Sequence, residues 1–261
     1  MIPVAVRTSF RLAASFVSRD LRSRYLGSIS GLAWALVQPL LMLAIYTLVF
    51  VEILKVRWPG TAGAGYVPYL AIGLWPWTAF AEGLNRGTVA IHEHAALLSK
   101  VALPRGLLVF APVAGSFLLH GAGFLAVLLV LAAAGEPIRA IGLPFALLVY
   151  VLLFGFALGL AWLFAALSVF VRDLALVLAQ VLTLWFFLTP IFFARDMIPE
   201  RFASALSLNP MAAFVEMLRS CLIAGAPAPL APWLVPVAAA VALAVGIGLF
   251  GRLQRHFEDY L

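Results

Sequence analysis

Long uncharged stretches alternate with short charged segments along the chain. Six of these stretches cover residues 25–51, 58–81, 106–135, 140–171, 174–194 and 220–251. Each reaches or exceeds the roughly 20 residues that a helix needs to cross the hydrocarbon core of a bilayer. Their apolar residues follow one another without the alternation of a transmembrane β-strand. The pattern therefore predicts an all-α membrane protein with six transmembrane helices, at about residues 31–52, 66–89, 106–134, 142–170, 174–194 and 233–251.

The N-terminal stretch has a different, amphipathic pattern. As a helix, residues 7–26 have one apolar face and one polar, basic face. The apolar face holds Phe10, Ala13, Ala14, Val17 and Leu21, and the polar face holds Arg7, Arg11, Ser15, Ser18 and Arg22. Such a helix lies at the membrane interface. It is either an anchor that binds anionic lipid, the simpler interpretation, or a gate helix beside the entrance for an anionic headgroup.

On the side of the termini, only one connecting segment is long. Residues 91–105 predict a short cytoplasmic helix that ends at the helix-disrupting Pro104. It is either an ordinary connection or a docking element for a partner. The link between the fourth and fifth spans has only residues 171–174. Little of the chain therefore reaches the cytoplasm, and any energy-coupling machinery must be a separate chain.

The outer segment between the fifth and sixth spans is too long for a hairpin and too apolar for a free loop. Pro199 can begin one short helix. Asn209 and Pro210 form the cap and first turn of a second helix, which runs to about Leu222. We therefore expect two short re-entrant helices within residues 197–222, dipping into the outer leaflet.

Composition and charge identify lipid as the main solvent of this chain. It is 65% hydrophobic and 11% charged, whereas soluble domains average roughly 45–50% apolar and about 25% charged residues. Six spans place both termini on one side, which carries ten lysines and arginines against six on the other. Because the positive side stays inside, we expect a multi-pass protein of the bacterial inner (plasma) membrane with both termini cytoplasmic. No signal peptide is expected, since arginines interrupt any early apolar core.

The motifs of an ATPase are missing from the sequence. A P-loop ends in Gly-Lys followed by Ser or Thr, and the two lysines, Lys55 and Lys100, are each followed by valine. Gly246, Gly248 and Gly251 spell Gly-x-Gly-x-x-Gly, but they end a spanning helix and cannot begin a βαβ unit. We expect no catalytic residue and no cofactor in this chain.

Metal and proton chemistry are not expected either. His92 and His94 diverge on a helix and no acidic cluster joins them, so no metal site is predicted. His120, inside the third span, is interpreted as hydrogen-bonded in the bundle rather than as a proton relay. Glu82 and Arg86 lie four residues apart and are interpreted as a self-neutralised pair on one helix face, the alternative being a substrate contact.

Glycine spacing indicates close helix packing. Gly155 and Gly159, like Gly27 and Gly31, form small-xxx-small pairs. Such pairs let two helices approach closely in a membrane. Packing is a sufficient explanation for them.

Aromatic residues are frequent near the predicted membrane surfaces and in the first two spans. The candidates for a functional role are Trp34, Tyr46, Phe50, Trp75 and Trp77. They are either interfacial and packing residues or a track on which the rings of a sugar chain stack while it slides. Both interpretations stay open. For Trp185, Phe186 and Phe187 packing is favoured.

Five segments occur in a recognisable order. They are Arg19-Asp20-Leu21-Arg22-Ser23-Arg24-Tyr25-Leu26-Gly27-Ser28, Trp34 with Pro39-Leu40, Gly73-Leu74-Trp75-Pro76-Trp77, Leu97-Leu98-Ser99-Lys100-Val101-Ala102-Leu103-Pro104-Arg105, and Leu208-Asn209-Pro210-Met211. Together they resemble the membrane permeases of ABC-type polysaccharide exporters, which export capsule, O-antigen and teichoic acid. The match covers nearly the whole chain. Two departures are Leu103, where the family often has an aromatic residue, and Gly106, where it often has an acidic one.

The resemblance implies a homodimer that works with two cytoplasmic ATPase subunits to export a lipid-linked polysaccharide. ATP and Mg would be bound by the ATPase subunits. A periplasmic or outer-membrane export partner is compatible with this function, and nucleic acid is not expected. The implied groups of residues are a cytoplasmic entrance at Arg19, Arg22, Arg24 and Tyr25, an ATPase-coupling contact at His92, Glu93, His94, Lys100, Pro104 and Arg105, and an outer gate with Phe202, Asn209 and Pro210.

Two rival functions keep the same helices. The first is an ABC exporter permease for a small amphiphile or drug. The second is a scaffold or passive channel without an ATPase, which the structured segment at residues 91–105 disfavours.

Overall fold

The computed structural model describes residues 4–25, 29–53, 55, 65–95, 104–193, 197, 207–224 and 232–259, with side chains from residue 11 on except 24–25, 29–36 and 258–259. All regular elements among these residues are helical. They are α1 (Val4–Tyr25), α2 (Ile29–Thr47), η1 (Leu48–Ile53), α3 (Tyr66–Glu93), α5 (Arg105–Ala133), η2 (Ala140–Gly142), α6 (Leu143–Ser168), α7 (Leu174–Phe187), α9 (Pro210–Arg219), η4 (Ser220–Ala224), α10 (Leu234–Leu253) and η5 (Gln254–Asp259).

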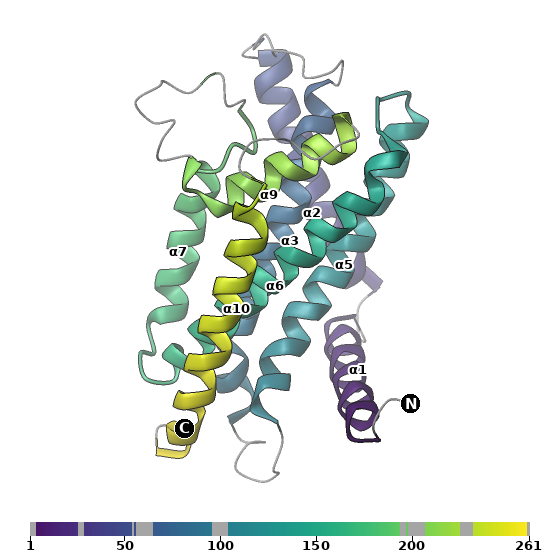
Figure 1. Cartoon of the computed structure of the whole chain (residues 1–261). Coiled ribbons are helices and arrows are strands. Elements are labelled where there is room, and N and C mark those ends of the chain that lie inside the picture. Colours follow the sequence, from purple (N-terminus) through teal and green to yellow (C-terminus); the bar gives the residue numbers. More distant parts are fainter. Residues whose placement is uncertain are drawn as a thin grey trace.

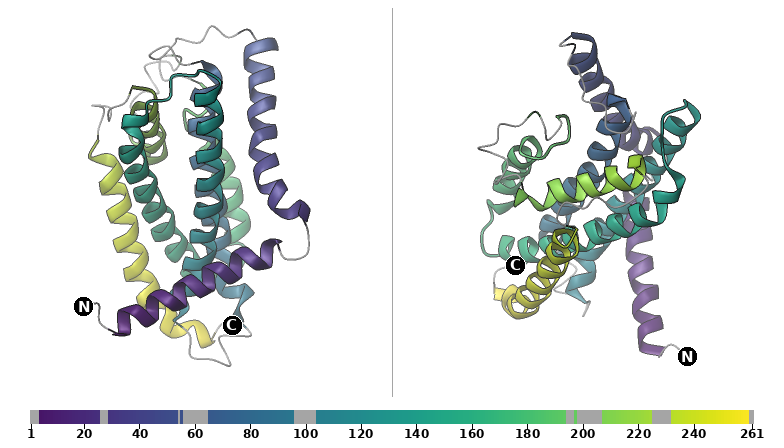
Figure 2. Two further views of the ribbon diagram at one scale, coloured as in Figure 1. Left: turned by 90° about the vertical axis from the view of Figure 1, so that its right-hand side faces the viewer. Right: turned by 45° about the horizontal axis from the view of Figure 1, so that its top comes forward.

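The long helices form a bundle with one helix across each end. α2, α3, α5, α6, α7 and α10 run along the long axis of the molecule, and α9 lies across one end (Figure 1). α1 crosses the opposite end at a steep angle to the bundle, and η5 lies at that same end (Figure 2). The position of α1 agrees with a helix that lies along a membrane surface.

α3 is the central helix of the bundle. Its 28 residues pack against α2, α5, α6, α7 and α9. Burial extends from Leu70 near one end to Ile91 near the other. Because protein surrounds much of its length, α3 can carry polar residues that a lipid-facing helix avoids.

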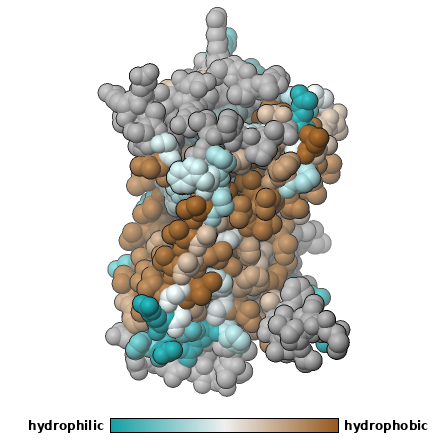
Figure 3. All heavy atoms as spheres, in the orientation of Figure 1, coloured by the Kyte–Doolittle hydropathy of each residue, from teal (hydrophilic) through white to brown (hydrophobic). Residues whose placement is uncertain are grey.

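Several of the helices packed around α3 have the composition of membrane spans. Three described stretches are long and apolar enough to cross a bilayer: Arg105–Ala133, Ala140–Ser168 and Leu234–Phe257. Val37–Ile53 and Leu174–Phe187 are apolar but shorter. Figure 3 shows hydrophobic side chains around the middle of the molecule and hydrophilic ones gathered toward the end that holds η5. The chain is thus an all-helical integral membrane protein.

α6 and α10 cross with their backbones in contact. A Cβ atom added at Gly159 would collide with the backbone of Ala242, and one added at Gly246 would collide with the backbone of Gly159. The close approach predicted for Gly159 is therefore confirmed. Gly248, by contrast, has nothing within 4 Å of an added Cβ. The Gly-x-Gly-x-x-Gly string in α10 thus includes a helix-packing glycine.

Two helices, α7 and α3, end clearly away from their predicted boundaries. α7 ends at Phe187, although a span to residue 194 was predicted, because Pro190 has no N–H for a helical bond and disfavours helical geometry in the residue before it. The chain continues in bends to Phe193. α3 runs to Glu93, four residues beyond the predicted end, and so includes the start of the predicted coupling segment.

The outer segment is described only in its second half. The helix predicted to begin at Pro199, and Phe202 with it, lies outside the described residues. The second predicted helix is present as α9, continued by η4 to Ala224. Asn209 caps α9 as predicted, because its side-chain oxygen accepts from the backbone N–H groups of Met211 and Ala212.

Candidate functional site

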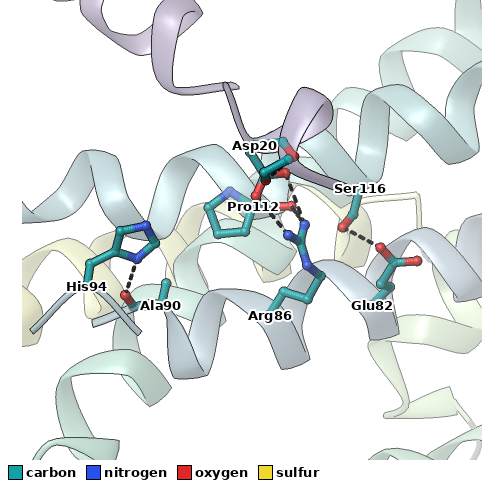
Figure 4. Close-up of polar contacts among 8 residues, drawn as sticks. Asp20, Glu82, Arg86, Ala90, His94, Pro112 and Ser116 are labelled. Carbon is teal, nitrogen blue, oxygen red and sulfur yellow. Dashed lines mark hydrogen bonds and ion pairs between the residues drawn. The ribbon is translucent and has the colours of Figure 1, made fainter. Parts of the chain in front are cut away.

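A cluster of polar side chains joins α1, α3 and α5 toward the end of the bundle where α1 lies. We name it the inner polar cluster: Asp20, Glu82, Arg86, Ser116 and His120. Arg86 on α3 donates to both carboxylate oxygens of Asp20 on α1, at 2.7 and 3.1 Å (Figure 4). It also donates to the carbonyl of Pro112 on α5, at 3.3 Å. A bidentate arginine–carboxylate pair is strong and directional, so it fixes α1 on the bundle.

Small residues of α5 provide the surface on which α1 lies. Val17 packs against Ala111 and Ala114. Gly115 leaves space for the carboxylate of Asp20, since an added Cβ would lie 2.5 Å from Oδ2. An apolar contact therefore docks α1 on α5, and an ionic contact docks it on α3.

Glu82 has its own partners on α5. Its Oε1 accepts from Ser116 Oγ at 3.0 Å, and its Oε2 lies 2.6 Å from His120 Nε2. The contact joins an imidazole nitrogen to a carboxylate oxygen at hydrogen-bond distance. His120 is thus hydrogen-bonded in the bundle, as the sequence predicted. Its side chain is 3% exposed, and its Nδ1 has no hydrogen-bond partner among the described residues.

The sequence interpretation of Glu82 and Arg86 as one local pair is incomplete. The structure gives each residue partners on another helix, and Asp20 is 66 residues away from Arg86. A rule based on i, i+4 spacing cannot detect such contacts. One signal was available: Asp20 is the first acidic residue of the sequence, stands among arginines, and adjoins the apolar face of the amphipathic helix.

Two of the predicted entrance residues, Arg19 and Arg22, have described side chains on α1. Arg19 and Arg22 are exposed, whereas Asp20 faces the bundle. Arg24 and Tyr25 belong to the last turn of α1, and their side chains are outside the described residues. α1 therefore presents positive charge outward while its carboxylate holds it to α3.

Aromatic rings from α2, η1, α3, α7 and the segment after α7 meet in the other half of the bundle. We name this the aromatic cluster: Tyr46, Phe50, Trp77, Phe186, Phe187 and Phe192. The ring of Tyr46 stacks on that of Phe192 with centroids 6.0 Å apart and lies 6.3 Å from that of Phe186. Trp77 lies 5.6 Å from Phe186. Phe186, interpreted from sequence as packing, thus links two residues of the predicted sugar track.

The remaining two residues of the predicted track have different surroundings. Trp75 is 1% exposed and part of the hydrophobic core, and within the described part of the chain its Nε1 has no hydrogen-bond partner. Trp34 lies within α2, and its side chain is outside the described residues. Sugar contact by the predicted track stays a prediction.

The predicted coupling contact is described at its two flanks. At the end of α3, His92 Nε2 lies 2.9 Å from the carbonyl of Ser168 at the end of α6. His94 Nδ1 lies 2.9 Å from the carbonyl of Ala90, and Glu93 is exposed. The first flank is therefore anchored to α6 through His92.

The second flank begins α5. Pro104 is the exposed residue before the first turn. Arg105 donates to the carbonyl of Gln254, and its guanidinium carbon lies 5.9 Å from the ring centroid of Phe257 in η5. Lys100 lies outside the described residues. The start of α5 is thus tied to the C-terminal turn.

At the end of the bundle where α9 lies, Asn209 connects α7 to α9. Its Oδ1 accepts from Trp185 Nε1 at 2.8 Å, and its Nδ2 donates to the carbonyl of Leu188 at 3.1 Å. Pro210 occupies the first turn of α9. The cap predicted from sequence therefore also joins two helices, which the sequence did not indicate. Within the part of the chain that the structure describes, no group of three or more His, Cys, Asp or Glu could hold a metal ion.

Residues 12–223 match the family described as ABC-2 type transporter. The chain belongs to this family. The matched range begins in α1 and ends in η4, so it includes both the inner polar cluster and the aromatic cluster. ABC-2 membership also agrees with the resemblance found in the motifs.

Curated relatives of this ABC-2 chain are O-antigen export proteins. It is 27% identical over 266 residues to "O-antigen export system permease protein RfbA" of Klebsiella pneumoniae, covering 97% of this chain and 95% of the relative. It is 31% identical over 202 residues to the protein of the same name from Myxococcus xanthus, covering 77% and 75%. The similarity to polysaccharide export permeases is thus confirmed over nearly the full length.

Proposed function

We propose that this chain is the transmembrane permease subunit of an ABC transporter that exports a lipid-linked polysaccharide, of the O-antigen or capsule class, across the inner membrane. The observation that carries the proposal is similarity along 97% of the chain to a relative named for O-antigen export. The aromatic cluster supports it, because stacked rings bind the CH faces of sugars without demanding one fixed register.

The assembly proposed is a homodimer with two cytoplasmic ATPase subunits that bind ATP and Mg. In each subunit, six spans correspond to α2 with η1, α3, α5, α6, α7 and α10. Both termini are cytoplasmic, and α9 belongs to the re-entrant outer gate. In support of this orientation, α1 and η5 lie at the same end of the bundle (Figure 1).

The roles of the inner residues follow from this orientation. The exposed Arg19 and Arg22 attract the anionic headgroup of the lipid-linked glycan to α1. His92, Glu93 and Arg105 flank the contact with the ATPase. The sugar chain then passes the rings of the aromatic cluster toward α9.

The first experiment is a glycan inventory in a strain that lacks this gene. Surface polysaccharide and lipid-linked polysaccharide retained in the cytoplasm are measured separately. We expect loss outside with accumulation inside, restored by the wild-type gene. Unchanged amounts of surface and retained polysaccharide would contradict the proposal and leave export of a small amphiphile as the better candidate.

A second experiment tests the subunit directly. The chain is reconstituted with its ATPase in vesicles, and ATP hydrolysis is measured with and without lipid-linked glycan. We expect stimulation by the glycan. Stimulation by amphiphilic drugs alone would favour the rival function.

A further inference from the structure

A buried arginine holds the non-helical segment that follows α7. We name residues 188–193 the post-α7 segment. Arg219, at the end of α9, is 6% exposed. Its Nη1 donates to the carbonyl of Pro190 at 2.5 Å, and its Nη2 donates to that of Ile191 at 2.8 Å. Its Nε donates to the carbonyl of Tyr69 on α3 at 3.1 Å. Three nitrogens of one guanidinium therefore serve three different carbonyls.

The other backbone carbonyls of the segment also accept hydrogen bonds. The Asn209 side chain donates to the carbonyl of Leu188 at 3.1 Å, and the backbone N–H of Ile191 donates to that of Thr189 at 2.7 Å. The hydroxyl of Tyr66 donates to the carbonyl of Phe192 at 3.3 Å, and that of Tyr69 donates to the carbonyl of Phe193 at 3.2 Å. Non-helical backbone at membrane depth is tolerated only where protein or water satisfies it. Here side chains of α3 and α9 do so, and we name Tyr66, Tyr69, Asn209 and Arg219 the carbonyl clamp.

α3 is shaped to accept the arginine. The guanidinium carbon lies 3.3 Å from the ring centroid of Tyr69, a close cation–π contact. A Cβ atom added at Gly73 would lie 2.6 Å from Arg219 Nη2. Only glycine leaves this space open without displacing the guanidinium.

The clamped segment carries Phe192, a ring of the aromatic cluster. Phe192 lies within ring-contact distance of five other aromatics. Its centroid is 5.7 Å from Phe50, 5.8 Å from Phe186, 5.7 Å from Phe187, 5.1 Å from Phe193 and 6.0 Å from Tyr46. Phe192 directly follows the second residue whose carbonyl Arg219 holds, so the arginine determines where this ring lies.

We propose that Arg219 is a positioning residue of the glycan path: it fixes the post-α7 segment and thereby holds Phe192 against Tyr46 and Phe50 in the aromatic cluster. The proposal rests on the proposed export function for the nature of the substrate. It adds that the width of the outer half of the path is determined by α3 and α9 through Arg219, rather than by α7 alone.

The test uses thiol labelling of the post-α7 segment in the assembled complex. Thr189 is fully buried, so Thr189→Cys reports opening of the segment to a membrane-impermeant maleimide. The native Cys221 is buried as well, and the wild-type chain gives the background. Arg219→Gln removes the positive charge and leaves one donor nitrogen in place of three. Gly73→Ala keeps the guanidinium but displaces it. Gly248→Ala, whose added Cβ meets nothing within 4 Å, is the matched control.

We expect both Arg219→Gln and Gly73→Ala to raise the labelling rate at least about tenfold, because local opening becomes populated. Gly248→Ala leaves the rate unchanged. Arg219→Lys also gives a raised labelling rate, since one ammonium cannot reach three divergent carbonyls. In the reconstituted complex, Gly73→Ala lowers glycan-stimulated ATP hydrolysis while basal hydrolysis and subunit abundance stay near wild type.

Two results would overturn the proposal. The first is equal labelling in wild type, Arg219→Gln and Gly73→Ala; where the Arg219→Gln subunit does not accumulate, Gly73→Ala decides. The second is raised labelling with unchanged glycan stimulation, which would make the clamp irrelevant to the path. Absence of glycan stimulation in the wild type would instead count against the export function, while labelling would still decide whether Arg219 holds the segment.

Discussion

Two arginines link α3 to other parts of the molecule, and their contacts differ in kind. Arg86, toward the end where α1 lies, pairs with the carboxylate of Asp20, and its side chain is 30% exposed. Arg219, at the outer end, is buried and donates to three backbone carbonyls. The first contact joins two charges that other ions can replace. The second joins a charge to the dipoles of three backbone carbonyls in a buried site.

The difference indicates which end of the molecule can open. The Arg86–Asp20 pair is only partly shielded from solvent, so salt can weaken it, and α1 is held by a contact that can be released. A buried guanidinium that loses its partners is costly, because its desolvation is no longer compensated. We therefore expect α1 to detach during transport while the post-α7 segment stays clamped.

The largest expected effect is that of removing the outer arginine. Arg219→Met leaves three carbonyls without their donors and should destabilise the subunit by about 3–5 kcal/mol. Arg86→Met at the partly exposed site should cost clearly less. Thermal unfolding of the two purified variants in detergent measures the contrast, and equal losses would remove the distinction between the two ends.

Next in size is exchange of the charges at the inner end. Asp20→Arg or Arg86→Asp alone places like charges together and should release α1. The double exchange should recover part of the contact, with a coupling energy of about 0.5–3 kcal/mol. Labelling of Val17→Cys, buried in the wild type, reports release of α1. Double and single variants with the same labelling would show that the pair does not hold this helix.

A smaller effect is expected from filling the space beside Asp20. Gly115→Ala adds a Cβ 2.5 Å from Asp20 Oδ2 and should cost about 1–3 kcal/mol through overpacking. In an Asp20→Ala background the same substitution should have almost no effect, because the carboxylate is gone. Stability of all four forms is compared, with Gly248→Ala as control. Additive losses would contradict the proposed steric link.

The smallest expected effect is that of salt. Raising the ionic strength from 0.1 M to 1 M shortens the Debye length from about 10 Å to about 3 Å. Labelling of Val17→Cys should then increase moderately, while labelling of Thr189→Cys at the outer end stays constant. A salt response at Thr189→Cys would mean that charge screening reaches the carbonyl clamp.

Local patterns in the sequence were sufficient for much of the fold. The long uncharged stretches predicted the helices, and the alternation of faces at residues 7–26 predicted α1 as an amphipathic helix across one end. The pair Asn209-Pro210 predicted the N-cap of α9, and the spacing of Gly155 and Gly159 predicted close helix packing. Each of these features depends on residues within a few positions of one another, which is what periodicity and capping rules describe.

The clusters themselves depend on contacts between distant residues. Arg219 meets Tyr69, 150 residues away, and from sequence it was one of six positive residues assigned to the outer side. Nothing in its neighbours indicates burial against carbonyls. The need for such an arginine arises only because α7 stops at Phe187 and leaves backbone groups without helical partners. Pro190 signals the break, but not what satisfies it.

The crossing of α6 and α10 at Gly159 and Gly246 limits how the subunit can move. Where two backbones touch, no layer of side chains lies between them that could change rotamers and let one helix slide past the other. We expect these two helices to travel as one rigid unit through the transport cycle. Any widening for a sugar chain then falls to helices outside this pair, such as α1 and α2, so each subunit combines a rigid part with a movable part.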